Sequence, residues 1–317
     1  MGGCMGTDKK VQILLSTYNG EKFLRQQLDS YLSMEDFECC CVLIRDDGSI
    51  DNTINILKDY EKYNNFKIVY GENWGVSKSY QWLIQNSNPT CSYFALSDQD
   101  DIWLPDKIKK ALNQLERLPQ EKAILFASSS QITDEELNPI GRTITPNRGV
   151  SFYNAVIQNI LPGHTQVFNL ELRNYLCDCG FEEAVAVDWW IYLVASALGT
   201  VVFEPSFTVL HRQHGNNTVG YQRRAWNMLR RRLHYILEGK GNAISIQARA
   251  FYLLFGDIIP EEYARELKNF LEGTKNIKTR FNYMRNAYIY RQEKHDDWKF
   301  WLLYLLGKYN LQNPRSK

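Results

Sequence analysis

Short apolar runs alternate with segments of helical spacing through the first hundred residues, and this rhythm is the strongest constraint on the fold. The runs lie at 11–15, 39–44, 66–70 and 93–96. Between them, apolar residues recur every three or four positions, as on one face of a helix. Strands that alternate with helices of this length indicate an α/β fold with a mostly parallel, doubly wound sheet. The stretches 122–132 and 163–169 predict further strands.

A polar segment directly follows each of the four apolar runs: STYNG, RDDGS, GENWG and SDQDD. Ligands of such sheets bind beyond the carboxyl ends of the strands, so we expect the four segments to line one cleft. The last segment holds Asp98, Asp100 and Asp101. Like charges this close cost stability unless a cation lies among them. An acidic turn in solvent is the alternative interpretation.

The acidic triplet does not fit a calcium loop. Ile102, Trp103 and Lys109 stand where such a loop needs an oxygen ligand, a Gly and a Glu. The remaining chemical use is a divalent cation, Mg²⁺ or Mn²⁺, that joins a protein carboxylate to a diphosphate.

The other polar segments are ambiguous when each is taken alone. Asp47 stands at a strand end, where a carboxylate can accept hydrogen bonds from a base or a ribose, but Ser49 and Asp51 beside it are ordinary helix caps. Ser16 and Tyr18 either line a base pocket or merely end a strand.

Taken in order, four segments resemble the family 2 glycosyltransferases, namely LLSTYNGEKFL, LIRDDGSIDNT, ENWGVSKSY and LSDQDDIWLPDKI. The resemblance continues through LPGHTQVFN, VDWWIYLVASALG and EPSFTVLHRQHGNNTVG, and so covers about residues 11–220. It implies a GT-A fold, a Rossmann-like sheet flanked by helices that binds a nucleotide sugar. Within that family, SDQDDIW and RQHGNN are most similar to the bacterial rhamnosyltransferase-like branch that builds surface polysaccharides.

The resemblance assigns roles on the donor side of the cleft. Ser16, Tyr18 and Asp47 match nucleoside-contacting positions, Asp98 the contact to ribose or donor sugar, and Asp100 the metal ligand, with Asp101 beside it. The implied donor is a nucleoside diphosphate sugar, with dTDP-L-rhamnose as the leading candidate, and the implied cofactor is Mg²⁺ or Mn²⁺.

On the acceptor side, Asp188 matches the catalytic base of an inverting reaction. The His that often precedes this Asp is Val187 here, and SKSY replaces the Ala-Arg-Asn wording of other branches. Trp189 and Trp190 supply flat faces for the acceptor, a glycan or a lipid-linked oligosaccharide, although either ring could belong to the core. Asp188 could alternatively cap the helix that follows.

The segment HRQHGNN adds cations and donors after a later strand. Arg212 and His214 are candidates to close over the diphosphate, and His214 is also a candidate metal ligand. A structural role is the alternative for a single His.

The chain divides by charge into a catalytic domain at 9–220 and a basic helical region at 221–317. Residues 1–220 hold 18 basic against 27 acidic residues, whereas 221–317 hold 19 against 9. A basic region beside an acidic body suggests an anionic partner, and peripheral membrane contact through 221–317, at the inner face of the cell membrane, is one expectation. A helical cap packed on the catalytic domain is the other, and no nucleic-acid module appears.

The remaining features concern the compartment and the rival functions. Seven cysteines without a CxxC pair indicate reduced thiols and a cytoplasmic protein. One rival is a sugar-phosphate nucleotidyltransferase, but STYNGEK supplies little of the Gly-rich basic loop that a triphosphate needs. A non-catalytic nucleotide-sugar-binding subunit of a polysaccharide assembly complex is the other.

Overall fold

The computed structural model describes residues 10–214 and 242–311. The chain divides into two compact units. The sheet unit comprises Met1–Thr145, Leu161–Phe181 and Ala186–Val219. The helical unit comprises Pro146–Ile160, Glu182–Val185 and Gly220–Lys317. Two segments that precede residue 220 belong to the helical unit, so neither unit is one continuous stretch of chain.

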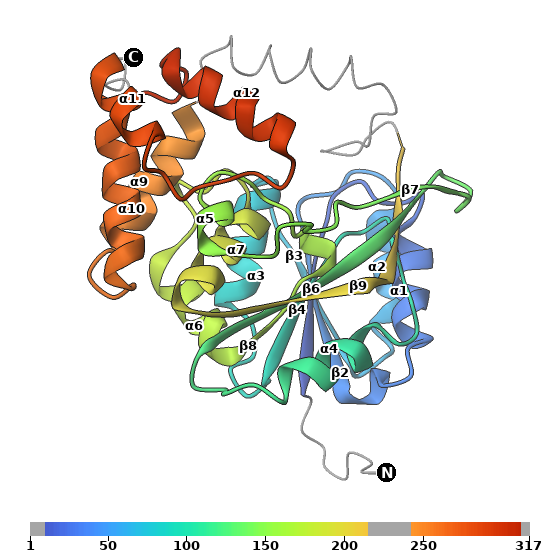
Figure 1. Ribbon diagram of the computed structural model, residues 1–317. Helices are drawn as coiled ribbons and strands as arrows, with labels where there is room; N and C mark the ends of the chain where they lie inside the picture. The colour runs from blue at the N-terminus through green and yellow to red at the C-terminus, as the bar shows by residue number, and fades with distance from the viewer. Residues whose placement is uncertain (1–9, 215–241, 312–317) are drawn as a thin grey trace. The chain divides into compact units, whose positions relative to one another are not determined.

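The sheet unit is built on one mixed sheet (Figure 1). Its strands are β1 (Val11–Thr17), β2 (Cys40–Asp46), β3 (Phe66–Tyr70), β4 (Tyr93–Ser97), β5 (Ile102–Trp103), β6 (Ala123–Thr133), β7 (Pro139–Arg142), β8 (Val167–Asn169) and β9 (Gly199–Arg212). Its α-helices are α1 (Leu24–Leu32), α2 (Thr53–Tyr60), α3 (Val76–Gln85), α4 (Lys107–Leu115), α6 (Leu170–Cys179) and α7 (Val187–Leu198). Two 3₁₀ turns are η1 (Phe37–Cys39) and η2 (Gly163–Thr165).

The strand order is β3-β2-β1-β4-β8-β6-β9-β5, and β7 pairs with β6. β1 pairs in parallel with β2 and β4, and β2 pairs in parallel with β3. β8 runs antiparallel to β4 and β6, whereas β6 and β9 are parallel. The predicted parallel arrangement of the first four strands is confirmed. It brings their carboxyl ends to one edge of the sheet.

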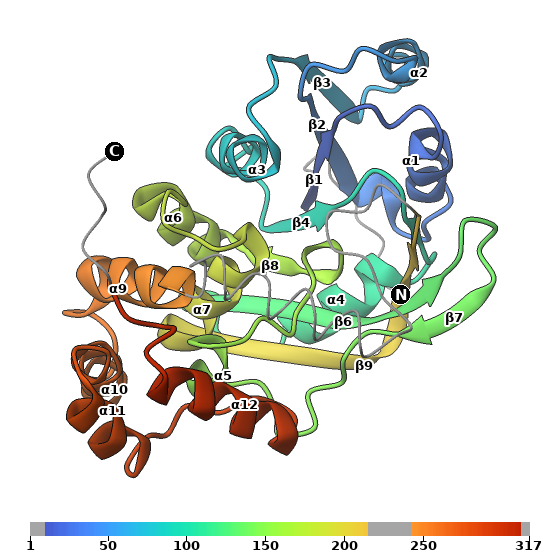
Figure 2. The same cartoon turned by 90° about the horizontal axis from the view of Figure 1, so that it is seen from above.

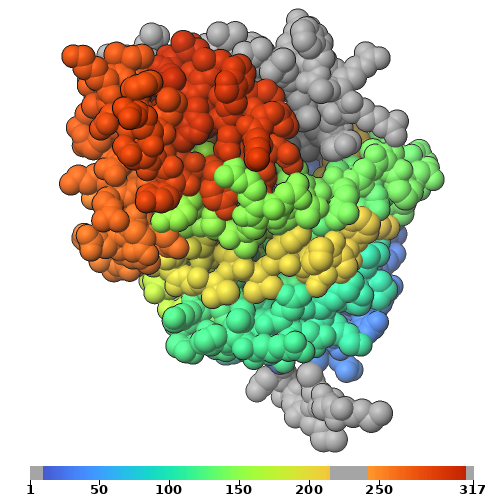
Figure 3. Space-filling view, in the orientation of Figure 1, coloured from blue at the N-terminus to red at the C-terminus, as the bar shows by residue number. Residues whose placement is uncertain are grey.

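Helices cover both faces of this sheet, as Figure 2 shows for α1 and α2 on one side and α3 and α6 on the other. Leu28, Leu57 and Ala111 carry α1, α2 and α4 into one core with the strands. In α4, Ile108, Ala111 and Leu115 are buried at helical spacing. Burying one such aliphatic side chain contributes roughly 1.5–3 kcal/mol, so these helices are held mainly by their apolar faces. β9 is only partly buried along its length and lies at the molecular surface in Figure 3 (gold).

The helical unit contains the helices α5 (Phe152–Ala155), α9 (Ala243–Phe255), α10 (Glu261–Gly273), α11 (Ile277–Met284) and α12 (Lys294–Leu305). Segment 146–160 belongs here because Asn154 Nδ2 donates to Tyr290 O at 3.1 Å and Arg148 pairs with Asp297. α10 packs on α9 and α11, and α11 packs on α12. The expected helical character of the C-terminal region is thus confirmed for the part that is described. Residues 221–241 of the predicted basic helical region lie outside the described residues.

No helix among residues 10–214 and 242–311 combines the length and the apolar character needed to cross a membrane.

Candidate active site

The loops that follow β1, β2, β3 and β4 converge at the carboxyl edge of the sheet, as the sequence predicts. Tyr18 N donates to Gln99 Oε1 at 2.9 Å and joins the loops after β1 and β4. Asp47 N donates to Thr17 O at 2.8 Å and joins the loops after β2 and β1. Trp74 N donates to Asp47 Oδ1 at 3.0 Å and adds the loop after β3.

Ser16, Tyr18 and Asp47, the predicted nucleoside contacts, lie together in this edge but differ in exposure. Tyr18 is 44% exposed, whereas Asp47 is 3% exposed. The Asp47 carboxylate pairs with Arg45 and also accepts a hydrogen bond from Gly75 N at 2.8 Å. Ser16 Oγ donates to a hydroxyl of α3, Ser79 Oγ, at 2.7 Å. Asp47 therefore fastens the loop after β3 to the loop after β2, a use that the sequence analysis does not include.

Trp74 is a residue of this edge that the sequence analysis missed. Its ring is 49% exposed, and the Arg45 guanidinium carbon lies 4.2 Å from the ring centroid. Together with Tyr18, it supplies an exposed aromatic face beside the anchored loops, and aromatic faces suit stacking on a nucleobase. An aromatic residue in the glycine-bounded segment GENWG was the available signal.

The acidic triplet places its three carboxylates in three different environments. The Asp98 side chain is 44% exposed and accepts a hydrogen bond from Tyr80 Oη at 3.2 Å. Asp100 is 15% exposed, and its Oδ2 lies 2.7 Å from His214 Nε2. Asp101 is fully buried. Asp98 and Asp100 therefore face the edge of the site, and Asp101 lies behind them.

Burial, followed by the charges of Asp101 and Asp98, raises the pKa of Asp100 to about 6, against the opposing effect of His214. An ionised carboxylate in such surroundings is stabilised by a nearby cation. Asp100 is therefore the member of the triplet best suited to a metal ligand, and the structure brings it together with the other predicted ligand, His214.

Asp101 is the centre of a buried network at the end of β9. Its Oδ1 accepts hydrogen bonds from His211 Nδ1 at 2.9 Å and Arg212 N at 3.1 Å, and the His164 ring stacks on His211 with centroids 4.3 Å apart. Burial alone would raise the pKa of Asp101, but the charges of His211 and His164 and these hydrogen bonds lower it. Burial would lower the pKa of His211, but Asp101 raises it to about 9. The sequence analysis missed His164 and His211.

Arg212 requires a correction, because the structure does not place it where a diphosphate could reach it. Its side chain is 2% exposed. Nε donates to Asp100 O at 3.1 Å, Nη2 donates to Gln26 Oε1 at 2.6 Å, and the guanidinium lies over the Phe23 ring. Arg212 thus braces the backbone of the acidic triplet against α1, and the expected direct contact to the donor is wrong for this conformation.

Asp188 lies in the first turn of α7, directly beside the turn η2. Its Oδ2 accepts a hydrogen bond from Gly163 N at 3.1 Å, and its Oδ1 accepts one from Trp189 N at 2.8 Å. The residue before α7 is Ala186, so Asp188 is not the N-cap. The next residue of η2, His164, places its Nδ1 3.5 Å from Asp98 Oδ2. The two consecutive residues Gly163 and His164 therefore connect the candidate base to the donor side of the cleft.

The two tryptophans after Asp188 separate into different environments. Trp189 is partly exposed. Trp190 is 1% exposed, and its Nε1 donates to Cys179 Sγ at 3.3 Å. Trp190 is therefore a core residue, and its expected role in binding the acceptor is wrong.

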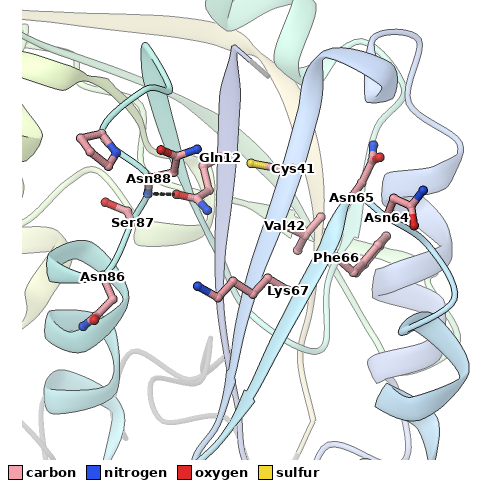
Figure 4. A pocket seen from close by; sticks show the side chains of 11 residues that line it. Gln12, Cys41, Val42, Asn64, Asn65, Phe66, Lys67, Asn86, Ser87 and Asn88 are labelled. Atoms are coloured by element: carbon pink, nitrogen blue, oxygen red, sulfur yellow. Dashed lines mark hydrogen bonds between the residues drawn. The ribbon is translucent and has the colours of Figure 1, made fainter. Parts of the chain in front are cut away.

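A hollow at the opposite edge of the sheet is a separate feature (Figure 4). Gln12, Cys41 and Phe66 contribute to it from the amino-terminal ends of β1, β2 and β3, and Asn88 N donates to Gln12 Oε1 at 2.6 Å. The predicted site residues, in contrast, follow the carboxyl ends of the strands.

The family model described as glycosyl transferase family 2 matches residues 12–175, more than half of the chain. The chain belongs to glycosyl transferase family 2. It is 27% identical over 222 residues to the dTDP-rhamnosyl transferase RfbG of Shigella flexneri, covering 65% of this chain and 73% of that protein. It is 36% identical over 104 residues to the uncharacterized glycosyltransferase MG025 of Mycoplasma genitalium, covering 31% of this chain and 34% of the relative.

Solved structures of low sequence identity share the fold of this family 2 glycosyltransferase. TarS 1-349 from S. aureus, in complex with UDP-GlcNAc, has a TM-score of 0.56 at 15% identity and covers 85% of this chain and 81% of its own. The mannosyltransferase PcManGT from Pyrobaculum calidifontis, in complex with GDP-Man and Mn²⁺, has a TM-score of 0.50 at 14% identity and covers 96% and 88%. The predicted GT-A fold is thereby confirmed.

The carboxylates and imidazoles of this glycosyltransferase fit a divalent cation. Asp98, Asp101, His164 and His211 each bring one ligand atom to within 4.8 Å of the others. Asp101 Oδ2 is buried without a hydrogen-bond partner. Asp100 and His214 form a second pair of donors beside this cluster. Carboxylate oxygens suit both Mg²⁺ and Mn²⁺, whereas imidazole nitrogens suit transition metals such as Fe and Zn.

Proposed function

We propose that this protein is a metal-dependent, inverting glycosyltransferase that moves L-rhamnose from dTDP-L-rhamnose to a glycan or lipid-linked acceptor in surface polysaccharide biosynthesis. Family membership and the similarity to a dTDP-rhamnosyl transferase support the donor class. The observation that carries the mechanism is the turn η2, because Gly163 contacts Asp188 and His164 lies beside Asp98. One turn therefore contacts the proposed base through Gly163 and lies beside the proposed donor-side carboxylate through His164.

On the donor side, Tyr18 and Trp74 offer exposed faces for the base, and Ser16 is hydrogen-bonded to Ser79 of α3. Asp47 is buried and holds the Trp74 loop through Trp74 N and Gly75 N, so it acts on the nucleoside through that loop. Asp98, the most exposed carboxylate of the triplet, binds a hydroxyl of the ribose or the donor sugar.

The metal ligands in this proposal are Asp100 and His214, which stand at the edge of the site. The alternative cluster contains Asp101, whose full burial keeps it from a diphosphate. A bound Mg²⁺ or Mn²⁺ would neutralise the charge that builds on the leaving nucleoside diphosphate.

On the acceptor side, Asp188 accepts the proton of the acceptor hydroxyl while that oxygen attacks the anomeric carbon. Gly163 N and Trp189 N hold the carboxylate by one oxygen each, which fixes its orientation toward the cleft. Trp189 stacks against the acceptor sugar. A single displacement of this kind inverts the anomeric configuration.

The test is a transfer assay with dTDP-L-rhamnose, UDP-GlcNAc and GDP-mannose as alternative donors and a panel of rhamnose-containing oligosaccharides as acceptors. We expect transfer from dTDP-L-rhamnose, loss of activity in EDTA with recovery in Mn²⁺, and a product of inverted configuration by NMR. Transfer from another donor would replace the sugar assignment, and a product with retained configuration would refute the role of Asp188. Binding of dTDP-L-rhamnose without transfer to any acceptor would favour a non-catalytic subunit.

We also propose that the protein works in the cytoplasm, at the inner face of the cell membrane. The described cysteines form no disulfide with one another, which agrees with a reducing compartment.

A further inference from the structure

The helix α12 exposes a line of large apolar side chains. Trp298, Leu302 and Leu306 follow each other at intervals of four residues and are 66%, 43% and 63% exposed. Phe300 and Tyr304, on the other side of the helix, are each 1% exposed and pack in the core of the helical unit. The apolar line is therefore additional to the face that holds α12 in place. Single exposed apolar residues are normal, but a continuous line of them indicates a binding surface.

The charge around this line is positive. Between residues 273 and 311 the chain has eight Lys and Arg residues against three Asp and Glu residues. Asp297 pairs with Arg148, and Asp296 lies 3.5 Å from Lys299. Lys294 and Lys308 are exposed and have no carboxylate at ion-pair distance among the described residues.

The neighbouring helix α11 repeats this combination. Ile277 and Phe281 are one helical turn apart and are 62% and 52% exposed. Lys278 and Arg285 stand exposed beside them. Since α11 packs on α12, both helices contribute to one region of the helical unit.

The end of α9 is a useful contrast within the same unit. Leu253 and Leu254 are 71% and 50% exposed. The exposed charges that follow them directly are acidic, namely Asp257, Glu261 and Glu262, and one exposed basic residue, Arg249, precedes the two leucines by a turn. An anionic surface would repel this apolar patch and attract the one on α11 and α12.

We propose that α11 and α12 bind the surface of an anionic phospholipid membrane. Trp298, Leu302 and Leu306 enter the headgroup region, where Trp is favoured because its ring is apolar and its N–H is polar. Lys294 and Lys308 contact lipid phosphates while their aliphatic stems cover apolar surface. The inference deepens the proposed function, since a lipid-linked acceptor is presented at such a surface, but the binding itself needs no turnover.

The experiment is sedimentation of the full chain with vesicles of phosphatidylcholine alone or with phosphatidylglycerol. The test variant is Leu302→Ser/Leu306→Ser, and the matched control is Leu253→Ser/Leu254→Ser, which removes the same two side chains from the acidic patch. A charge variant, Lys294→Glu/Lys308→Glu, tests the electrostatic part. Circular dichroism and thermal unfolding establish that each variant is folded.

We expect the wild type to bind the anionic vesicles and to lose binding as salt rises, because exposed charges are screened. The test variant should bind at least about tenfold more weakly, since each buried Leu contributes more than 1.4 kcal/mol, which is tenfold in affinity. The control should bind as the wild type does. Equal loss in test and control, equal binding to neutral vesicles, or no wild-type binding would overturn the proposal. So would a concentration-dependent dimer that only the test variant abolishes, since a second copy would then occupy the surface. A wild-type protein that binds the anionic vesicles but transfers no sugar would contradict the proposed function alone.

Discussion

Replacing Asp101 by Asn should destabilise the protein strongly at neutral pH and remove a specific part of its pH dependence. Asp101 is fully buried and accepts hydrogen bonds from His211 and from Arg212 N. An Asn in the same place keeps the size of the side chain but loses the charge. The protonated imidazole of His211 would then be buried without its counter-ion, which is among the costlier changes in a protein interior.

The magnitude follows from the pKa of His211, which Asp101 raises from 6.5 to about 9 despite burial. A difference of this size between the unfolded and folded states corresponds to about 3 kcal/mol of unfolding free energy. Because the folded pKa is the higher one, this stabilisation is fully present below pH 6.5 and is lost as the pH rises through about 9. The difference in stability between wild type and Asp101→Asn should therefore be largest near pH 6 and shrink toward pH 10.

Urea unfolding of both proteins at several pH values between 6 and 10 measures this difference directly. Asp98→Asn is the matched control, because Asp98 carries the same charge but its side chain is 44% exposed. Its unfolding free energy should fall much less, since exposed charges interact weakly. A constant difference between wild type and Asp101→Asn across this range would refute the buried ion pair.

Five further substitutions test the site. Asp100→Asn should abolish transfer while leaving the unfolding temperature near that of the wild type, because burial and the neighbouring charges already disfavour its ionised form; a variant that still transfers with normal metal dependence would remove Asp100 from the metal site. Asp188→Asn should lower kcat at least about a hundredfold in steady-state assays, with little change in donor affinity. Near-normal turnover would assign the role of base to another residue. Asp47→Ala should weaken the binding of dTDP, as measured by calorimetry, and dTDP should change the fluorescence of Trp74 less in this variant than in the wild type. An unchanged affinity for dTDP would exclude Asp47 from the donor site. Trp190→Ala should lower the free energy of unfolding by about 3–5 kcal/mol, as for other core tryptophans. Trp189→Ala should raise only the KM for the acceptor. The opposite pattern would restore the predicted role of Trp190 in binding the acceptor.

The part of the fold that the sequence predicts is the part with strong local signals. β1 to β4 are short apolar runs bounded by turn residues, and each one lies within a few residues of its predicted place. Only the end of β9 was predicted, as the strand before HRQHGNN, and its extent over Gly199–Arg212 escaped prediction because it mixes partly buried and polar residues. Its position beside β6 depends on pairing with a strand nearly eighty residues earlier, which no local pattern reveals.

The candidate site also has a part that local sequence signals predict and a part that they do not. Asp47, Asp98 and Asp100 were predictable because each follows an apolar run, and strand ends of a parallel sheet meet at one edge. The contact between Asp101 and His211 joins loops 110 residues apart, so only the folded chain shows it. Trp190 could have been recognised as a core residue, because Val187, Trp190 and Ile191 share the apolar spacing of one helix face.

The acidic triplet illustrates how adjacent identical residues acquire different functions through burial. Asp98 is exposed enough to bind a sugar hydroxyl, Asp100 is partly buried beside His214, and Asp101 is enclosed by His164, His211 and the backbone of Arg212. The enclosed carboxylate stabilises the end of β9, from which His214 extends to Asp100. If Asp101 were exposed, the backbone of Arg212, two residues before His214, would lose its buried hydrogen-bond partner. The proposed metal pair of Asp100 and His214 would then depend on a strand end that only weak surface contacts hold. The charge of Asp101 still raises the pKa of Asp100, but His211 and His164 compensate that charge from behind, so Asp101 can hold the geometry in front of it.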